Sequence, residues 1–140
     1  MRDFVRPENW HVTLRFLGDA DPNDVAAALE QGSFPAADIE MGPAVDVGTK
    51  GGHTLFVPVA GADDLAAEVV RVTAELGTEP IRPRFLGHIT IARLKRRANM
   101  PRVLGELISA SWRADEIALV QSTLRTEGPR YDTLATFPAT

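Results

Sequence analysis

Trp10-His11-Val12-Thr13-Leu14-Arg15-Phe16-Leu17-Gly18 is the stretch around which the chain is organised. A related stretch, His88-Ile89-Thr90-Ile91-Ala92-Arg93, follows 77 positions later, counted from His11 to His88. Successive side chains of a β-strand point to opposite faces, so the His and Thr of each copy share one face and the apolar residues share the other. Both stretches are therefore predicted to be strands that turn one face to a core and present imidazole and hydroxyl groups on the other.

Length and composition describe one soluble domain or two small lobes with a real core. The 140 residues are 44% hydrophobic and 24% charged, and none is Cys, which excludes disulfides and thiolate metal sites. No apolar run reaches the roughly 18 residues that span a bilayer, and no secretory leader is evident. We therefore expect a cytoplasmic protein that makes no contact with membranes.

Positive charge is concentrated around the second motif, although the net charge of the chain is −4. Between Pro80 and Gly105 there is no Asp or Glu, and the segment holds Arg82, Arg84, Arg93, Lys95, Arg96, Arg97 and Arg102. Such a run is often a solvated surface with compensating acids nearby. Beside a candidate site it also favours a ligand that carries phosphate.

Periodicity and turn residues predict an α+β protein. The predicted strands cover 2–5, 9–17, 37–47, 53–59, 85–94, 115–125 and 131–138, with turns at 48–52 and at 127–129. The predicted helices run from the cap residues 21–24 through Leu29, over 62–76 and over 100–109, and Gly32 and Gly77 end the first two. This order favours mainly antiparallel pairing, and an internal duplication is plausible because each motif strand precedes a helix.

The repeated motif suits phosphodiester chemistry. A histidine has an unperturbed pKa of about 6.5, so one neutral and one protonated imidazole can share base and acid duty. Threonine hydroxyls can hold phosphate oxygens, and arginine can neutralise developing charge. The third histidine, His53, has no Thr two residues later and is interpreted as a bystander. Three separated histidines without Cys or a H-E-x-x-H helix make a zinc site improbable on sequence grounds.

The two motifs resemble the paired signatures of the two-histidine phosphoesterase superfamily. Within it, the RNA 2',3'-cyclic phosphodiesterases, also named 2'-5' RNA ligases, are the most similar branch. The Pro7-Glu8-Asn9 segment also fits this branch, as does the tail with Ser122-Thr123-Leu124, Gly128, Tyr131, Leu134 and Phe137. The resemblance covers about residues 4 to 137.

The resemblance implies one two-lobed phosphoesterase domain over residues 1–140. Each lobe would supply one His-x-Thr-x strand to a central cleft, with antiparallel sheets and helices on the outer faces. The implied reaction hydrolyses an RNA 2',3'-cyclic phosphate to a 2'-phosphate without metal or other cofactor. His11 would be the general acid and His88 the general base, and Thr13, Thr90 and Arg93 would contact phosphate.

Two features depart from the family pattern, and the position of Arg93 poses a separate geometric problem. Members usually begin with a further strand and helix, which this chain lacks, so we expect a monomer whose open N-terminal sheet edge could pair with a partner. Gly87 stands where proline commonly precedes the second His. Arg93 is an odd number of residues after His88, so it faces away unless the strand ends, twists or bulges after Ile91. Arg15 has the correct parity and is the second candidate for phosphate contact.

Several functions remain compatible with the sequence. The leading hypothesis is RNA 2',3'-cyclic phosphodiesterase activity. The same cleft could act on ADP-ribose 1'',2''-cyclic phosphate or on a 2'-5'-linked oligonucleotide. A different class is a binding module that holds RNA ends or a nucleotide without turnover. If the motifs were incidental to an ordinary α+β domain, the two imidazoles would lie far apart.

Overall fold

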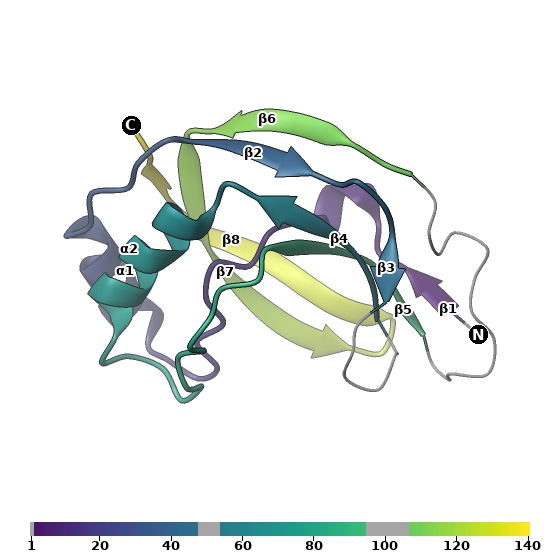
Figure 1. Ribbon diagram of the computed structural model, residues 1–140. Helices are drawn as coiled ribbons and strands as arrows, with labels where there is room; N and C mark the ends of the chain where they lie inside the picture. Colours follow the sequence, from purple (N-terminus) through teal and green to yellow (C-terminus); the bar gives the residue numbers. More distant parts are fainter. Residues whose placement is uncertain (1, 48–53, 95–106) are drawn as a thin grey trace. The chain divides into compact units, whose positions relative to one another are not determined.

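A computed structural model describes residues 2–47, 54–94 and 107–140 of the chain (Figure 1). The chain divides into two compact units, each assembled from three separate segments. Unit 1 contains Met1–Thr13, Asp38–Ala62 and Arg84–Trp112, and unit 2 contains Leu14–Ala37, Asp63–Pro83 and Arg113–Thr140.

A single sheet forms the framework of unit 1. Its strands are β1 (Arg2–Phe4), β2 (Ala37–Met41), β3 (Asp46–Val47), β4 (Thr54–Ala60), β5 (His88–Leu94) and β6 (Ala110–Ala114). They are ordered β1-β5-β4-β2-β6, and β3 also pairs with β4 (Figure 1). The pairs β1–β5, β4–β5, β2–β4 and β3–β4 are antiparallel, as the sequence predicts.

Alternation along β4 and β5 separates a core side from an open side. Leu55 and Val57 are fully buried on β4, and Ile89 and Ile91 are buried on β5. The residues between them on β4, Thr54, Phe56 and Pro58, are only half-buried. The second motif strand thus turns its isoleucines to the core, which confirms the prediction made from its pattern.

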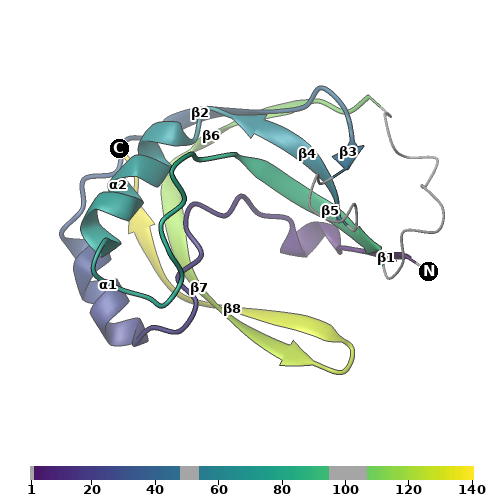
Figure 2. The same ribbon diagram turned by 60° about the horizontal axis from the view of Figure 1, so that its bottom comes forward.

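Two helices and a hairpin form unit 2. Helix α1 spans Pro22–Glu30, helix α2 spans Asp63–Thr73, and β7 (Glu116–Arg125) pairs antiparallel with β8 (Gly128–Pro138). Figure 2 shows α1 and α2 side by side and the long ribbon of β7 and β8. One core joins them, made of Val25, Leu29, Phe34, Leu65, Val69, Ile117, Phe137 and Ala139.

No helix in the described ranges is long and apolar enough to cross a membrane.

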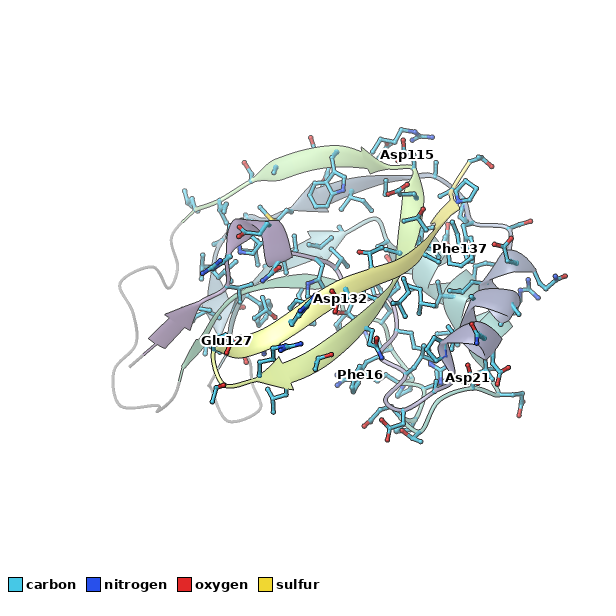
Figure 3. All side chains as sticks on the ribbon, turned by 180° about the vertical axis from the view of Figure 1, so that it is seen from behind. Phe16, Asp21, Asp115, Glu127, Asp132 and Phe137 are labelled. Carbon is cyan, nitrogen blue, oxygen red and sulfur yellow. The ribbon has the colours of Figure 1, made fainter. Side chains whose placement is uncertain are left out.

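Local signals place the start of α1 as predicted and the hairpin close to its predicted position, whereas α2 ends at Thr73, three residues before the predicted end. The Asp21 side chain accepts a hydrogen bond from the backbone N–H of Asn23 at 2.8 Å, and Pro22 occupies the first turn of α1. Gly77, with φ of +86°, follows the end of α2 in a conformation that favours glycine. In Figure 3, Glu127 lies at the hairpin turn, while Phe137 belongs to the core of unit 2.

The first motif does not form the strand predicted over 9–17. Among the described residues, its only ladder contact is an isolated bridge from Val12 to Ile89. A 3-10 turn at Pro7–Asn9 precedes it, and the chain enters unit 2 after Thr13. Strand alternation would turn Phe16 to the core. Because the strand is not continuous, the Phe16 side chain is instead 64% exposed.

Other boundaries also differ from the sequence prediction. The predicted strand 37–47 is split into β2 and β3, with Gly42-Pro43 between them. Most of the predicted helix 100–109 and the predicted turn 48–52 lie outside the described residues. Of the remainder of that helix, Leu107 forms an isolated bridge with Ala44, so the chain there is extended.

A carboxylate on α2 makes the stability of unit 2 sensitive to acid. Glu68 accepts hydrogen bonds from Arg71 at 2.6 and 2.9 Å and from the backbone N–H of Ser33 at 2.8 Å. The Arg71 side chain first, and the Ser33 amide second, lower the pKa of Glu68 from 4.5 to about 2. The ionised carboxylate is therefore favoured in the folded chain.

Acidification from pH 5 to pH 2 should consequently lower the melting temperature. The contribution of Glu68 is complete above its ordinary pKa and is lost as the pH falls toward its folded pKa of about 2. Thermal denaturation of Glu68→Gln should show a smaller loss over this range than the wild type. Glu30→Gln, at an exposed position on α1, serves as the control and should retain the wild-type slope.

Candidate active site

The two motifs meet as an antiparallel pair inside unit 1. Their central residues, Val12 and Ile89, form a β-bridge. The antiparallel direction sets His11 beside Thr90 and Thr13 beside His88. Neighbours of a bridged residue lie on the opposite face from it. The two His-x-Thr patterns therefore present their polar side chains together, on the side away from buried Ile89.

A loop in the N-terminal segment brings the first motif to this position. β1 pairs with the end of β5, with Phe4 opposite Ala92, and the backbone N–H of Val5 donates to the Ile91 carbonyl at 2.8 Å. Continuing that register would place residue 7 opposite Ile89, whereas residue 12 lies there, so five residues are looped out. The 3-10 turn takes up this excess and returns the chain to β5 at the motif.

A bulge in β5 brings Arg93 to the same face as the second motif. Leu55 pairs with Ala92 and Phe56 pairs with Thr90, so Ile91 is an extra residue on β5. Directly paired residues share a face, and Thr54, which pairs with Arg93, lies on the same face of β4 as Phe56. Arg93 therefore shares a face with His88, although the two residues are an odd number of positions apart.

We call the set His11, Thr13, His88, Thr90 and Arg93 the site face. All five residues belong to unit 1. His11, Thr13, His88 and Arg93 are exposed and Thr90 is half-buried. The expectation that each lobe supplies one motif strand is corrected here, because the boundary between the units falls after Thr13 and leaves both motifs in unit 1.

Both imidazoles are held in the same way by the backbone. Nδ1 of His11 donates to the carbonyl of Asn9 at 2.7 Å, and Nδ1 of His88 donates to the carbonyl of Leu86 at 2.9 Å. A carbonyl can only accept, so Nδ1 carries the hydrogen in each ring. Nε2 of each histidine is therefore the nitrogen that can give or take a proton.

Phe56 is a member of this site that the sequence analysis does not single out. Its ring centroid lies 5.6 Å from that of His88, with the ring planes at 69°. Alternation within 54–60 is visible in the sequence, but it does not say which residue of β5 lies opposite Phe56. That information comes only from the pairing of β4 with β5.

Arg15 has a structural role in unit 2. Its guanidinium donates to the carbonyl and hydroxyl of Thr73, the latter at 2.8 Å, and to the carbonyl of Leu76 at 2.8 Å. These acceptors lie at the C-terminal end of α2, where carbonyls lack partners within the helix and attract cations. The phosphate contact predicted for Arg15 is thus corrected to a cap of α2.

Some sequence expectations lie outside the described residues. These are His53 and the basic residues of 95–102. Arg82 and Arg84, which begin the basic segment, are exposed. No group of three His, Asp or Glu that could hold a metal ion occurs within 2–47, 54–94 and 107–140.

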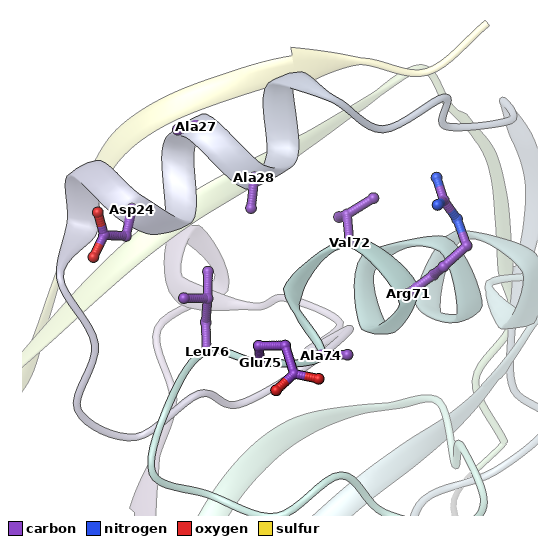
Figure 4. A pocket seen from close by; sticks show the side chains of 8 residues that line it. All are labelled: Asp24, Ala27, Ala28, Arg71, Val72, Ala74, Glu75 and Leu76. Carbon is purple, nitrogen blue, oxygen red and sulfur yellow. The ribbon is translucent and has the colours of Figure 1, made fainter.

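Unit 2 contains an open groove between its two helices (Figure 4). Its volume is about 530 Å³, and it is lined by Asp24, Ala27, Ala28, Arg71, Val72, Ala74, Glu75 and Leu76. The lining contains two carboxylates, Asp24 and Glu75, and one cation, Arg71, which is already paired with Glu68. This charge balance is unfavourable for a phosphate, and the groove contains no member of the site face.

Comparison with known proteins points to one family. The sequence model of the 2'-5' RNA ligase superfamily matches residues 4–125. An RNA 2',3'-cyclic phosphodiesterase of Aeropyrum pernix is 31% identical over 93% of this chain and 82% of its own length. The protein of the same name from Aquifex aeolicus is 33% identical over 98% of this chain and 81% of its own length.

Solved structures show the same fold. A crystal structure of a Thermus thermophilus protein superposes with a TM-score of 0.78 at 28% identity, covering 98% of this chain and 81% of the other. The structure of E. coli LigT complexed with 3'-AMP gives a TM-score of 0.76 at 21% identity, covering 98% and 80%. These likenesses establish the α+β class with antiparallel sheets.

Proposed function

Because the chain belongs to the 2'-5' RNA ligase superfamily, we propose that it hydrolyses RNA 2',3'-cyclic phosphate ends to 2'-phosphates. The observation that carries the proposal is the antiparallel meeting of two His-x-Thr motifs, each with its Nδ1 bound to a backbone carbonyl. Relatives with the name RNA 2',3'-cyclic phosphodiesterase support the choice of substrate.

The chemistry needs two proton transfers at one phosphorus. Nε2 of His88 takes a proton from water as the water oxygen bonds to phosphorus. The bond from phosphorus to the 3' oxygen breaks, and Nε2 of His11 gives that oxygen its proton. The products are a 2'-phosphate and a 3' hydroxyl. If a 5' hydroxyl replaces water, the same steps form a 2'-5' linkage, which is the ligase reaction.

The other members of the site face would stabilise the negative charge of the transition state. Thr13 and Thr90 can donate hydroxyl hydrogens to the non-bridging oxygens. Arg93 can pair with the same oxygens through its fork of N–H donors. With one imidazole as base and the other as acid, no metal or other cofactor is required for these steps.

The proposed working molecule is a monomer, one two-lobed domain over residues 1–140. Both motifs come from one chain and lie in one unit, so a second copy is not needed to complete the site. In this proposal an RNA end or a related nucleotide binds at the site face.

A direct test is hydrolysis of nucleoside 2',3'-cyclic phosphates in excess EDTA, with products identified by phosphorus NMR. We expect 2'-phosphates only, full activity with the chelator, and a bell-shaped dependence of kcat/KM on pH, since one imidazole must be neutral and the other charged. Loss of activity in EDTA, or a single inflection in the pH profile, would contradict the mechanism.

Two further outcomes would change the proposed function. The structures of LigT with 3'-AMP, ATP and NADP+ concern nucleotides, so the substrate panel should include ADP-ribose 1'',2''-cyclic phosphate. Preference for that compound would keep the mechanism and change the substrate. Tight, salt-sensitive binding of a 2'-phosphate end without any turnover would identify a binding module.

A further inference from the structure

One aromatic side chain contacts a site-face imidazole from the neighbouring strand. Phe56 on β4 pairs directly with Thr90, so it lies diagonally across from His88 on the same face. The two rings meet edge to face, with centroids 5.6 Å apart and planes at 69°. This is a favoured geometry for an aromatic pair.

Core packing does not account for the placement of Phe56. The buried side of β4 is filled by Leu55 and Val57, which are fully buried, and by Val59. Phe56 points to the other side and is only half-buried. On this open face of β4 the ring of Phe56 contacts the imidazole of His88.

The backbone of His88 is tied to the same strand that carries Phe56. Val59 N–H donates to the Gly87 carbonyl at 2.9 Å. A Cβ at Gly87 would come within 2.6 Å of the Val59 carbonyl oxygen, so only glycine permits this close approach without a shift of the backbone. Glycine at position 87 thus brings the start of β5 tightly against β4.

We propose that Phe56 is a positioning residue for His88. The hydrogen bond from Nδ1 to the Leu86 carbonyl holds one edge of the imidazole, but rotation of the ring about its Cβ–Cγ bond would break it. Contact with the Phe56 ring removes this rotation and directs Nε2 toward the reacting phosphate. The inference rests on the proposed function and adds the group that orients its base.

The test uses Phe56→Leu, which keeps apolar bulk but removes the ring, and Phe56→Tyr, which keeps the ring. For Phe56→Leu we expect kcat to fall by about 10- to 100-fold, with KM changed by less than about twofold, because orientation is lost while substrate contacts remain. Phe56→Tyr should restore kcat to within about threefold of the wild type.

Nitrogen NMR of the His88 ring provides a readout that does not require turnover. In the wild type, the shifts of neutral His88 should report hydrogen on Nδ1, and in Phe56→Leu they should move toward a mixture of the two tautomers. His11, held by a different carbonyl, should keep its shifts in both variants and serves as the internal control.

The outcomes separate this inference from the function on which it rests. Unchanged kcat and unchanged His88 shifts in Phe56→Leu would overturn the positioning role. A rise in KM at constant kcat would also overturn it, because Phe56 would then contact substrate. If the wild type turned over no cyclic phosphate, the proposed function would fail, while the His88 shifts would still decide whether Phe56 orients the ring.

Discussion

Replacing His88 with alanine is expected to lower kcat/KM for a nucleoside 2',3'-cyclic phosphate by about 10³-fold. The reason is that Nε2 of His88 is the proposed acceptor of the proton from water, and no other group of the site face can take its place. His88 is exposed, so the free energy of unfolding of the variant should lie within about 1 kcal/mol of that of the wild type. Steady-state kinetics and urea denaturation measure the two quantities.

The other histidines provide matched controls for this prediction. His11→Ala should cause a loss of similar size, and combining it with His88→Ala should add little, because acid and base act as a unit. His53→Ala should retain wild-type activity, since His53 lacks the His-x-Thr pattern. Full activity of His88→Ala, or a loss as large in His53→Ala, would contradict the two-histidine assignment.

Replacing Arg93 with alanine is expected to lower kcat/KM by about 10²-fold without a comparable loss of stability. Arg93 is exposed, and the bulge at Ile91 places it on the same face of the sheet as Thr90. Its guanidinium is the cation of the site face that can pair with phosphate oxygens. Added guanidinium ion should restore part of the activity, and Arg93→Lys should recover less than the full rate because it lacks the planar fork.

Arg15→Ala is the matched control because it removes the same side chain from the other motif. Arg15 donates to Thr73 and Leu76 at the end of α2. Loss of hydrogen bonds from a charged group should lower the free energy of unfolding by roughly 1.5–3 kcal/mol, while kcat/KM at low temperature stays close to that of the wild type. The reverse pattern, with Arg15→Ala inactive and Arg93→Ala active, would exchange the two roles.

Features that depend on neighbouring residues could be predicted from the sequence. The Asp21 cap, the glycine after α2 and the β7–β8 hairpin follow from side chains a few positions apart, and each is present. The buried face of the second motif strand follows from alternation, as Ile89 and Ile91 show. The choice of His11 and His88 as candidates also needed only the repeated pattern.

Features that depend on strand pairing could not be predicted in this way. The first motif alternates like a strand, yet of its described residues only Val12 joins the ladder, because β1 already occupies the end of β5 and a 3-10 turn intervenes. The choice between Arg15 and Arg93 as the candidate for phosphate contact also depends on strand pairing. Parity favoured Arg15, but its guanidinium caps α2, whereas a bulge turns Arg93 to the site face.

By itself, the sequence determined the α+β class, the start of α1 and the choice of two histidines as candidates, because each rests on periodicity or on interactions within a few residues. Only the tertiary structure decided that both motifs lie in one unit, that Arg93 faces them and that Phe56 contacts His88. The physical reason is that register between strands is set by hydrogen bonds and packing across the sheet. One extra residue in a strand turns every side chain beyond it to the opposite face of the sheet. The sequence around a bulge does not indicate where that extra residue lies.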